Sequence, residues 1–274
     1  MRIHVIFTCY NRADKTRNCV LRLLEGNPSV DFHFIAVNDG STDNTGTMLN
    51  EINSQRGCIT VINGDGSLFY SKGMRKGMDA LNASGETPDY VMLVNDDVAF
   101  EPRAAEKLIA ESTSKHNAVI VGATCDESGA FTYGGVSYKK GTIDYSLLSC
   151  EQSDVLCDTF NANCVLIPWQ WYTSVPPMDD RYAHAAGDFD YGFSLSKAGA
   201  PIYTSGFYVG VCGRNPSKGT WQDKSLPRME RLKKKESPKG LPLGSWLHFL
   251  YKNFGVKQVL LHGFTPYLKI LLGL

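Results

Sequence analysis

The sequence lacks the motifs that identify the most common nucleotide-dependent enzymes and hydrolases. It contains no GxxxxGK[ST] phosphate-binding loop, no GxSxG nucleophile elbow and no HExxH zinc motif, which excludes the chemistry that each motif performs. Residues 64–69 begin like the dinucleotide-binding pattern GxGxxG, but they lack the third glycine, which lets a helix pack closely on a strand.

Net charge and paired cysteines are also missing. The 28 basic and 28 acidic side chains cancel, so the whole chain has no electrostatic attraction for nucleic acid. The eight cysteines form no CxxC pair and match no zinc-ligand spacing. Residues 1–8 run straight into a strand-like segment with no secretory signal. We therefore expect a reduced, cytoplasmic protein that binds neither zinc nor nucleic acid.

Strand-like and helix-like segments alternate over the first hundred residues. Short runs rich in β-branched and aromatic residues are separated by helical periodicity, the strands at 3–8, 32–37, 58–62 and 90–94 and the helices at 15–24, 45–52 and 71–81. Such repeats predict an α/β fold, with right-handed crossovers and a mostly parallel sheet covered by helices on both faces. The alternation then weakens, leaving strands at 119–122 and 165–167 and a helix at 188–197.

Polar residues follow each of the first four predicted strands, at 8–12, 38–41, 63–66 and 95–97. Ligands of mostly parallel sheets bind beyond the carboxyl ends of the strands, so these four ends predict one site. A single Asp at such a place is usually a turn residue or a helix cap. An Asn or Asp at four successive strand ends is harder to explain by turns alone.

The triplet Asn95-Asp96-Asp97 ends an apolar strand, and its carboxylates suit a hard cation that bridges a diphosphate. A β-turn capped by Asp is the alternative. At this point the sequence resembles the family 2 glycosyltransferases of the GT-A type, which carry a DxD-like triplet here. Residues 9–12 and the segment VNDGSTD at 37–43 also match. The resemblance covers residues 1–215 and implies a GT-A catalytic domain with a nucleotide-sugar-binding half (1–100) and an acceptor-binding half (101–215).

The resemblance implies a donor site around these strand ends. Asp39 would accept a hydrogen bond from the base, and Asp97 would bind the Mn²⁺ or Mg²⁺ that neutralises the departing diphosphate. Arg12 and Lys72 could contact phosphates or be solvated surface cations. The residues expected at the nucleotide sugar are Thr8, Tyr10, Arg12, Asp39, Asp65, Lys72, Asn95 and Asp96.

Residues 178–182 and 187–190 resemble the family segment that ends in a Glu-Asp pair, whose Asp is the catalytic base. Gly187 replaces the Glu, so Asp188 occupies the base position without its acidic neighbour. Asp190 is the competing base and is otherwise expected at the acceptor with Trp169 and Trp171. A plain N-cap role for Asp188 and core packing of the two Trp are the alternatives.

Many relatives have a late His that completes the metal site. The corresponding residues here, 206–214, offer Cys212 but no His, and His184 is the available substitute.

Residues 216–274 form a basic segment with eleven Lys or Arg against three Asp or Glu, a net charge of +8. A linker-like stretch at 216–242 precedes apolar segments at 245–254 and 259–274, and Gly263 and Pro266 leave no uninterrupted span of about 20 apolar residues. This predicts a basic amphipathic helical extension. It either contacts an anionic membrane surface, at the inner face of the cell membrane, or packs on the catalytic body or on a second subunit.

Together these features predict an inverting glycosyltransferase that moves a sugar from a UDP- or dTDP-sugar to a glycan or lipid-linked acceptor in bacterial polysaccharide biosynthesis. Two alternatives stay open. Gly187 is compatible with a non-catalytic carbohydrate-binding or scaffolding relative. A sugar-nucleotide pyrophosphorylase is disfavoured, because residues 9–12 do not form a Gly-rich, Arg- and Lys-bearing loop.

Overall fold

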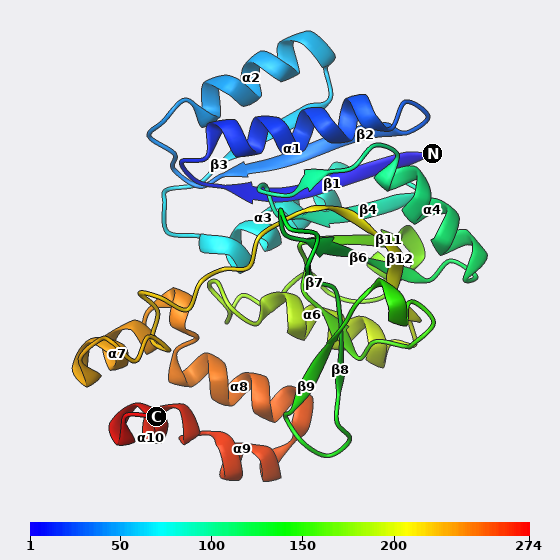
Figure 1. Cartoon of the computed structure of the whole chain (residues 1–274). Coiled ribbons are helices and arrows are strands. Elements are labelled where there is room, and N and C mark those ends of the chain that lie inside the picture. The colour runs from blue at the N-terminus through cyan, green and yellow to red at the C-terminus, as the bar shows by residue number, and fades with distance from the viewer.

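The computed structural model describes all 274 residues, and a nine-stranded sheet lies at its centre (Figure 1). The N-terminal part alternates as predicted: β1 (Arg2–Cys9), α1 (Ala13–Gly26), β2 (Asp31–Asn38), α2 (Thr45–Arg56), β3 (Ile59–Asn63), α3 (Phe69–Ser84) and β4 (Tyr90–Val94). The strands lie in the order β3-β2-β1-β4, and every neighbouring pair is parallel. The strand–helix periodicity of the sequence is therefore confirmed.

The second half of the sheet is mixed. It consists of β5 (Ala99–Phe100), β6 (Val119–Cys125), β7 (Phe131–Tyr133), β11 (Cys164–Pro168) and β12 (Ile202–Val211). Strand β11 runs antiparallel to both β4 and β6, and Cys164 pairs with Val94. The start of β11 therefore lies beside the carboxyl end of β4. A small separate sheet contains β8 (Gly135–Tyr138), β9 (Tyr145–Leu148) and β10 (Thr159–Phe160).

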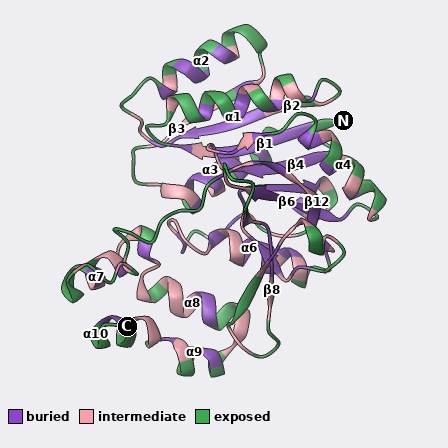
Figure 2. Cartoon of the chain, in the orientation of Figure 1, coloured by how far each residue is buried: buried purple, intermediate pink, exposed green.

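Alternating side chains of the strands build an apolar core on each face of the sheet. On β1, Val5 and Phe7 face one side, where they pack with α1, α2 and α4 (Ala104–Ser114). Ile6 faces the other side, which is covered by α3, α5 (Trp169–Tyr172) and α6 (Gly187–Lys197). Figure 2 shows the result, a buried sheet between layers of helices that are exposed on their outer surfaces.

The C-terminal extension packs beneath α6, at the opposite end of the molecule from α1 and α2 (Figure 1). It contains α7 (Arg228–Lys235), α8 (Leu243–Phe254), α9 (Val256–His262) and α10 (Thr265–Leu272). The predicted linker at 216–242 is thus partly helical. Arg231 and Lys235 of α7 are buried, and hydrogen bonds within the extension offset the cost of burying their charges. No helix combines the length and the apolar character needed to cross a bilayer.

Candidate active site

A cleft of about 670 Å³ opens where the carboxyl ends of β1, β2 and β4 meet the start of β11. Among the residues singled out from the sequence, it is lined by Thr8, Tyr10, Arg12, Asp39, Asn95, Asp96, Asp97, His184 and Asp188. The residues from Thr8 to Asp97 lie at or just beyond the carboxyl ends of the parallel strands β1, β2 and β4. Strand β11 runs in the opposite direction and begins at the same edge of the sheet, so the topology brings both halves of the chain together there.

The turn after β1 and the turn after β2 hold each other in place. Asn11 has a positive φ of 50°, and its Oδ1 accepts the backbone N–H groups of Thr42 at 2.7 Å and Asp43 at 3.3 Å. Asp43 in turn accepts the N–H of Thr45 at 2.9 Å and of Ala13 at 3.3 Å. One carboxylate therefore satisfies donors in the first turns of both α1 and α2, which explains the polar character of residues 41–45.

Asp39 organises the loop between β3 and α3. Its buried carboxylate accepts N–H groups from Gly66 at 2.9 Å, Leu68 at 3.3 Å and Phe69 at 3.0 Å. Gly40 has a φ of 72°, and a Cβ there would overlap the backbone of Gly66. These contacts place Phe69 in the wall of the cleft. A carboxylate has about four acceptor positions, so Asp39 keeps capacity for one more donor.

Arg12 lies across the acidic triplet. Its Nη1 is 3.1 Å from both Asp96 Oδ1 and Asp97 Oδ2, and Thr16 donates to the other oxygen of Asp96 at 2.9 Å. Burial raises the pKa of Asp96, and the positive charge of Arg12 opposes that rise. Both oxygens of Asp96 therefore contact side chains of the protein. Asp97 is the more exposed carboxylate of the pair.

The residues around Asp97 fit a hard divalent cation that takes most of its ligands from elsewhere. No group of three His, Cys, Asp or Glu side chains is placed to hold a metal. Asp97 is partly exposed, and the buried Oδ1 of Asn95 has no hydrogen-bond partner. Mg²⁺ and Mn²⁺ commonly bind through one or two carboxylates, with phosphate and water completing the shell.

Neither proposed substitute for the late His joins Asp97 in such a group. The Sγ of Cys212 lies 3.8 Å from Asp97 Oδ1, and burial, followed by the charge of Asp97, raises the pKa of its thiol to about 11. His184 lines the cleft, and burial lowers its pKa to about 4. Its imidazole is therefore neutral at physiological pH.

Asp188 lies in the first turn of α6 and faces the cleft. It accepts N–H groups from Ala162 at 3.3 Å and Phe189 at 2.9 Å. Burial nevertheless raises its pKa to about 6, since desolvation disfavours the charged form. The N-cap residue of α6 is Ala186, so Asp188 does not have the capping role that the sequence left open. A carboxylate with this pKa is suited to accept a proton near neutral pH.

The absence of a Glu before Asp188 has a packing cause. A Cβ at Gly187 would overlap the Oγ of Ser71 and lie 2.7 Å from its Cβ. Ser71 is buried in α3, and its hydroxyl donates to the carbonyl of His184 at 2.6 Å. Helix α3 thus occupies the space that a larger side chain at position 187 would need.

Asp65 and Lys72 lie outside the cleft. Asp65 is exposed, and its Oδ1 accepts from the backbone N–H of Ser67 at 3.0 Å, which is the ordinary behaviour of Asp in a turn. Its neighbour Gly66 lines the cleft instead. Lys72 is exposed on α3.

Trp169 and Trp171 also lie outside the cleft. They follow β11, which runs antiparallel to β4, so they emerge at the edge of the sheet opposite to the cleft. Trp169 stacks on Tyr172 with ring centroids 5.3 Å apart. Trp171 donates its indole N–H to the carbonyl of Asn117 at 2.9 Å. Both rings pack against the core, so the geometry favours the packing role that the sequence left open.

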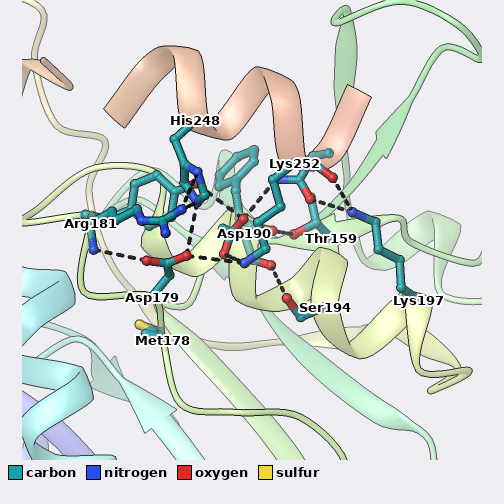
Figure 3. Close-up of polar contacts among 12 residues, drawn as sticks. Thr159, Met178, Asp179, Arg181, Asp190, Ser194, Lys197, His248 and Lys252 are labelled. Carbon is teal, nitrogen blue, oxygen red and sulfur yellow. Dashed lines mark hydrogen bonds and ion pairs between the residues drawn. The ribbon is translucent and has the colours of Figure 1, made fainter. Parts of the chain in front are cut away.

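Asp190 is buried between α6 and α8 (Figure 3). It accepts from Lys252 Nζ at 2.6 Å, Asn253 Nδ2 at 2.9 Å and the Tyr182 hydroxyl at 3.3 Å. Asp179 makes a second link to α8, since its carboxylate contacts His248 at 3.0 Å. Asp190 therefore fastens the extension to the body and does not line the cleft.

The structure adds cleft residues that the sequence analysis did not single out. They include Phe69, Tyr70, Tyr133, Asn161, Asn163 and Lys239. Asn161 and Asn163 lie just before β11. The sequence analysis looked for polar residues after strands, so it did not identify them. Lys239 comes from the stretch predicted as a linker, and only the path of the extension brings it to the cleft.

Comparisons with known proteins agree with this arrangement. Residues 4–162, more than half of the chain, match the sequence family described as Glycosyl transferase family 2. No curated protein sequence gives a significant match. Among solved structures, a mannosyltransferase of Pyrobaculum calidifontis, PcManGT, described in complex with GDP-Man and Mn²⁺, aligns with a TM-score of 0.61 and 11% identity. The alignment covers 99% of this chain and 73% of that one.

TarS of S. aureus aligns with a TM-score of 0.58 and 14% identity, over 93% of this chain and 44% of that one. This chain thus spans less than half of TarS. At these identities the structural similarity establishes the fold, and the sequence match establishes the relationship. The chain belongs to glycosyltransferase family 2 and has the GT-A fold.

Proposed function

We propose that the protein is an inverting, metal-dependent glycosyltransferase that uses a nucleoside-diphosphate sugar and an acceptor hydroxyl. The observation that carries the proposal is the shared cleft of Asp97 and Asp188. Asp188 takes the proton of the acceptor hydroxyl while that oxygen attacks the anomeric carbon. The bond from this carbon to the diphosphate oxygen breaks on the opposite face, so one displacement inverts the configuration. A bound Mn²⁺ or Mg²⁺ supplies positive charge to the diphosphate.

The nucleotide end of the donor fits the side of the cleft formed by β1, β2 and α3. Asp39 keeps one acceptor position for the imide N–H of uracil or thymine, while its other positions hold the loop at 66–69. Tyr10 lines the cleft and is half exposed, so its ring is available to stack on a base. This supports a UDP- or dTDP-sugar as donor.

The acceptor side follows from the extension. Residues 1–215 would form the catalytic domain and 216–274 a basic extension. Its last two helices and the turn between them expose apolar side chains, which include Leu260 of α9, Phe264 of the turn and Leu271 of α10. No Asp or Glu occurs after Glu236. An apolar surface with only positive charges suits anionic lipid. This supports a glycan or lipid-linked acceptor in bacterial polysaccharide biosynthesis, used at a membrane surface.

A screen of nucleotide sugars tests the proposal. The melting temperature would be measured with UDP-, dTDP- and GDP-sugars, with and without Mn²⁺, since a ligand of the folded state raises it by mass action. We expect one nucleotide class to stabilise the protein, and more so with Mn²⁺. Release of the nucleoside diphosphate from that donor would then be followed over time. No stabilisation by any donor would contradict the proposal, and binding without turnover would favour the non-catalytic relative.

A further inference from the structure

The stretch that joins β12 to α8 is held in place by contacts of buried side chains. Arg231 of α7 is buried, and its guanidinium donates to the carbonyls of Trp221 and Leu274, each at 2.9 Å. One side chain therefore joins the start of this stretch to the end of the chain. We call residues 216–242 the strap.

A buried lysine fixes the turn at the end of the strap. Lys235 donates to the carbonyl of Leu241, and its ammonium lies 5.8 Å from the ring centre of Trp221 and 5.3 Å from that of Tyr267. Burial lowers its pKa to about 8. Gly240 packs so closely that a Cβ would overlap the carbonyl of Lys234. These contacts leave the turn at 238–241 little conformational freedom.

The same turn is tied to the segment that carries Asp188. Leu241 packs against an apolar cluster that joins Tyr182, Phe193 and Phe249. Helix α8, which follows immediately, binds Asp179 and Asp190 through His248 and Lys252 (Figure 3). These two acidic residues flank the segment that contains His184 and Asp188. The position of the strap relative to the catalytic segment is therefore fixed at several points.

Lys239 is at the tip of this turn and lines the cleft. The cleft contains the four carboxylates Asp39, Asp96, Asp97 and Asp188 but only two cationic side chains, Lys239 and Arg12. Arg12 is engaged by Asp96 and Asp97. Lys239 makes no hydrogen bond or ion pair within the protein, and its charge contributes to the lowered pKa of His184. A fixed turn thus presents an uncompensated cation to an otherwise acidic cleft.

We propose that Lys239 binds the diphosphate of the donor and stabilises the negative charge that develops on it as the sugar leaves. The proposal rests on the function proposed above. When the bond between the anomeric carbon and the diphosphate oxygen breaks, its electron pair goes to that oxygen. A lysine ammonium is a compact point charge well suited to phosphate oxygens, and the exposed Lys239 can reach a ligand in the cleft without breaking a contact within the protein. The extension would therefore supply a substrate-binding residue as well as a surface.

The test compares Lys239→Met with Lys233→Met, which removes an exposed lysine of the strap that does not line the cleft. Calorimetric titration with UDP, dTDP and GDP, and with the matching monophosphates, would be done in the presence of Mn²⁺. We expect Lys239→Met to weaken diphosphate binding about 10- to 100-fold, as for a lost hydrogen bond to a charged group. Monophosphate binding should weaken less, Lys233→Met should match the wild type, and Lys239→Arg should recover most of the affinity.

Each result decides between the two proposals. Unchanged diphosphate affinity in Lys239→Met would overturn the role of Lys239 and leave the proposed function standing. Equal losses in Lys239→Met and Lys239→Arg would also overturn it, because they would indicate a structural role for the turn. A wild-type protein that binds none of the three diphosphates would contradict the proposed function itself.

Discussion

Asp188 and Asp190 are two residues apart on α6 and face different environments. Asp188 lines the cleft, whereas Asp190 is hydrogen-bonded to Lys252 and Asn253 of α8. Two residues of an α-helix turn a side chain through about 200°. Replacing Asp188 is therefore expected to affect catalysis, and replacing Asp190 is expected to affect stability.

Replacing Asp188 with Asn should slow turnover strongly while leaving the donor bound. Asn keeps the size of the side chain but cannot accept a proton, and loss of a general base typically slows the chemical step about 10²- to 10⁴-fold. Donor affinity should barely change, because Asp39 and Asp97 are separate parts of the cleft. Single-turnover rates and donor dissociation constants would be compared for both proteins. A normal rate in Asp188→Asn would place the base elsewhere.

Replacing Asp190 should instead destabilise the protein. Removing one partner of a buried ion pair costs about 3–5 kcal/mol, and we expect the lower end because Lys252 is partly exposed. Urea unfolding of Asp190→Ala would measure the free energy of unfolding. Asp154→Ala is the control, since it removes an almost fully exposed partner of Lys115 and should change the free energy of unfolding far less, because solvent screens an exposed pair. Equal costs for both variants would contradict the anchoring role of Asp190.

The pH dependence of transfer should reflect the raised pKa of Asp188, which is about 6. Only the deprotonated carboxylate can accept the proton, so kcat/KM, which reports the groups of the free enzyme, should rise about tenfold per pH unit below pH 6 and level off above it. The folded protein keeps the proton of Asp188 up to about pH 6, whereas the unfolded chain loses it near pH 4. The wild type should therefore lose stability relative to Asp188→Asn as the pH rises from about 4 to 6. A kcat/KM that does not change between pH 5 and 7 would exclude Asp188 as the titrating base.

Strand and helix positions in the first hundred residues followed from periodicity, because each of these elements buries a regular set of apolar side chains in the two core layers. The antiparallel insertion of β11 carries no local signal, and it decides which end of that strand faces the cleft. For this reason Trp169 was expected at the acceptor but lies at the far edge of the sheet. Lys239 was missed for a related reason, since its place depends on buried contacts of Arg231 and Lys235, two residues whose charge predicted exposure.

Asp97 should be required for the effect of the metal on donor binding. Asp97→Ala should remove the extra stabilisation that Mn²⁺ gives to the protein with bound nucleoside diphosphate, while the melting temperature without ligand stays close to that of the wild type. Thr113→Ala, a change of an exposed residue on α4, serves as the control. EDTA should inhibit transfer by the wild type. Full activity in EDTA would exclude a metal-dependent reaction.

The extension should bind anionic vesicles through α9 and α10. The two helices and the turn between them expose Leu260, Phe264 and Leu271. Lys257 and Lys269 are the lysines within the helices. Each lysine near a bilayer that contains phosphatidylserine is worth about 1 kcal/mol. Replacing both lysines with Gln should thus weaken binding about 30-fold at low salt, while Phe264→Ser should weaken it through lost apolar contact.

The matched control is the double change of Arg17 and Arg56 to Gln. It removes the same charge from α1 and α2, at the opposite end of the molecule (Figure 1). Co-sedimentation with neutral and anionic vesicles would measure binding. Lys235 of α7 is left unchanged in this experiment, because it is buried and holds the turn that presents Lys239 to the cleft. If the wild type ignores anionic vesicles and elutes as a dimer, the apolar surface belongs to a second copy of the chain.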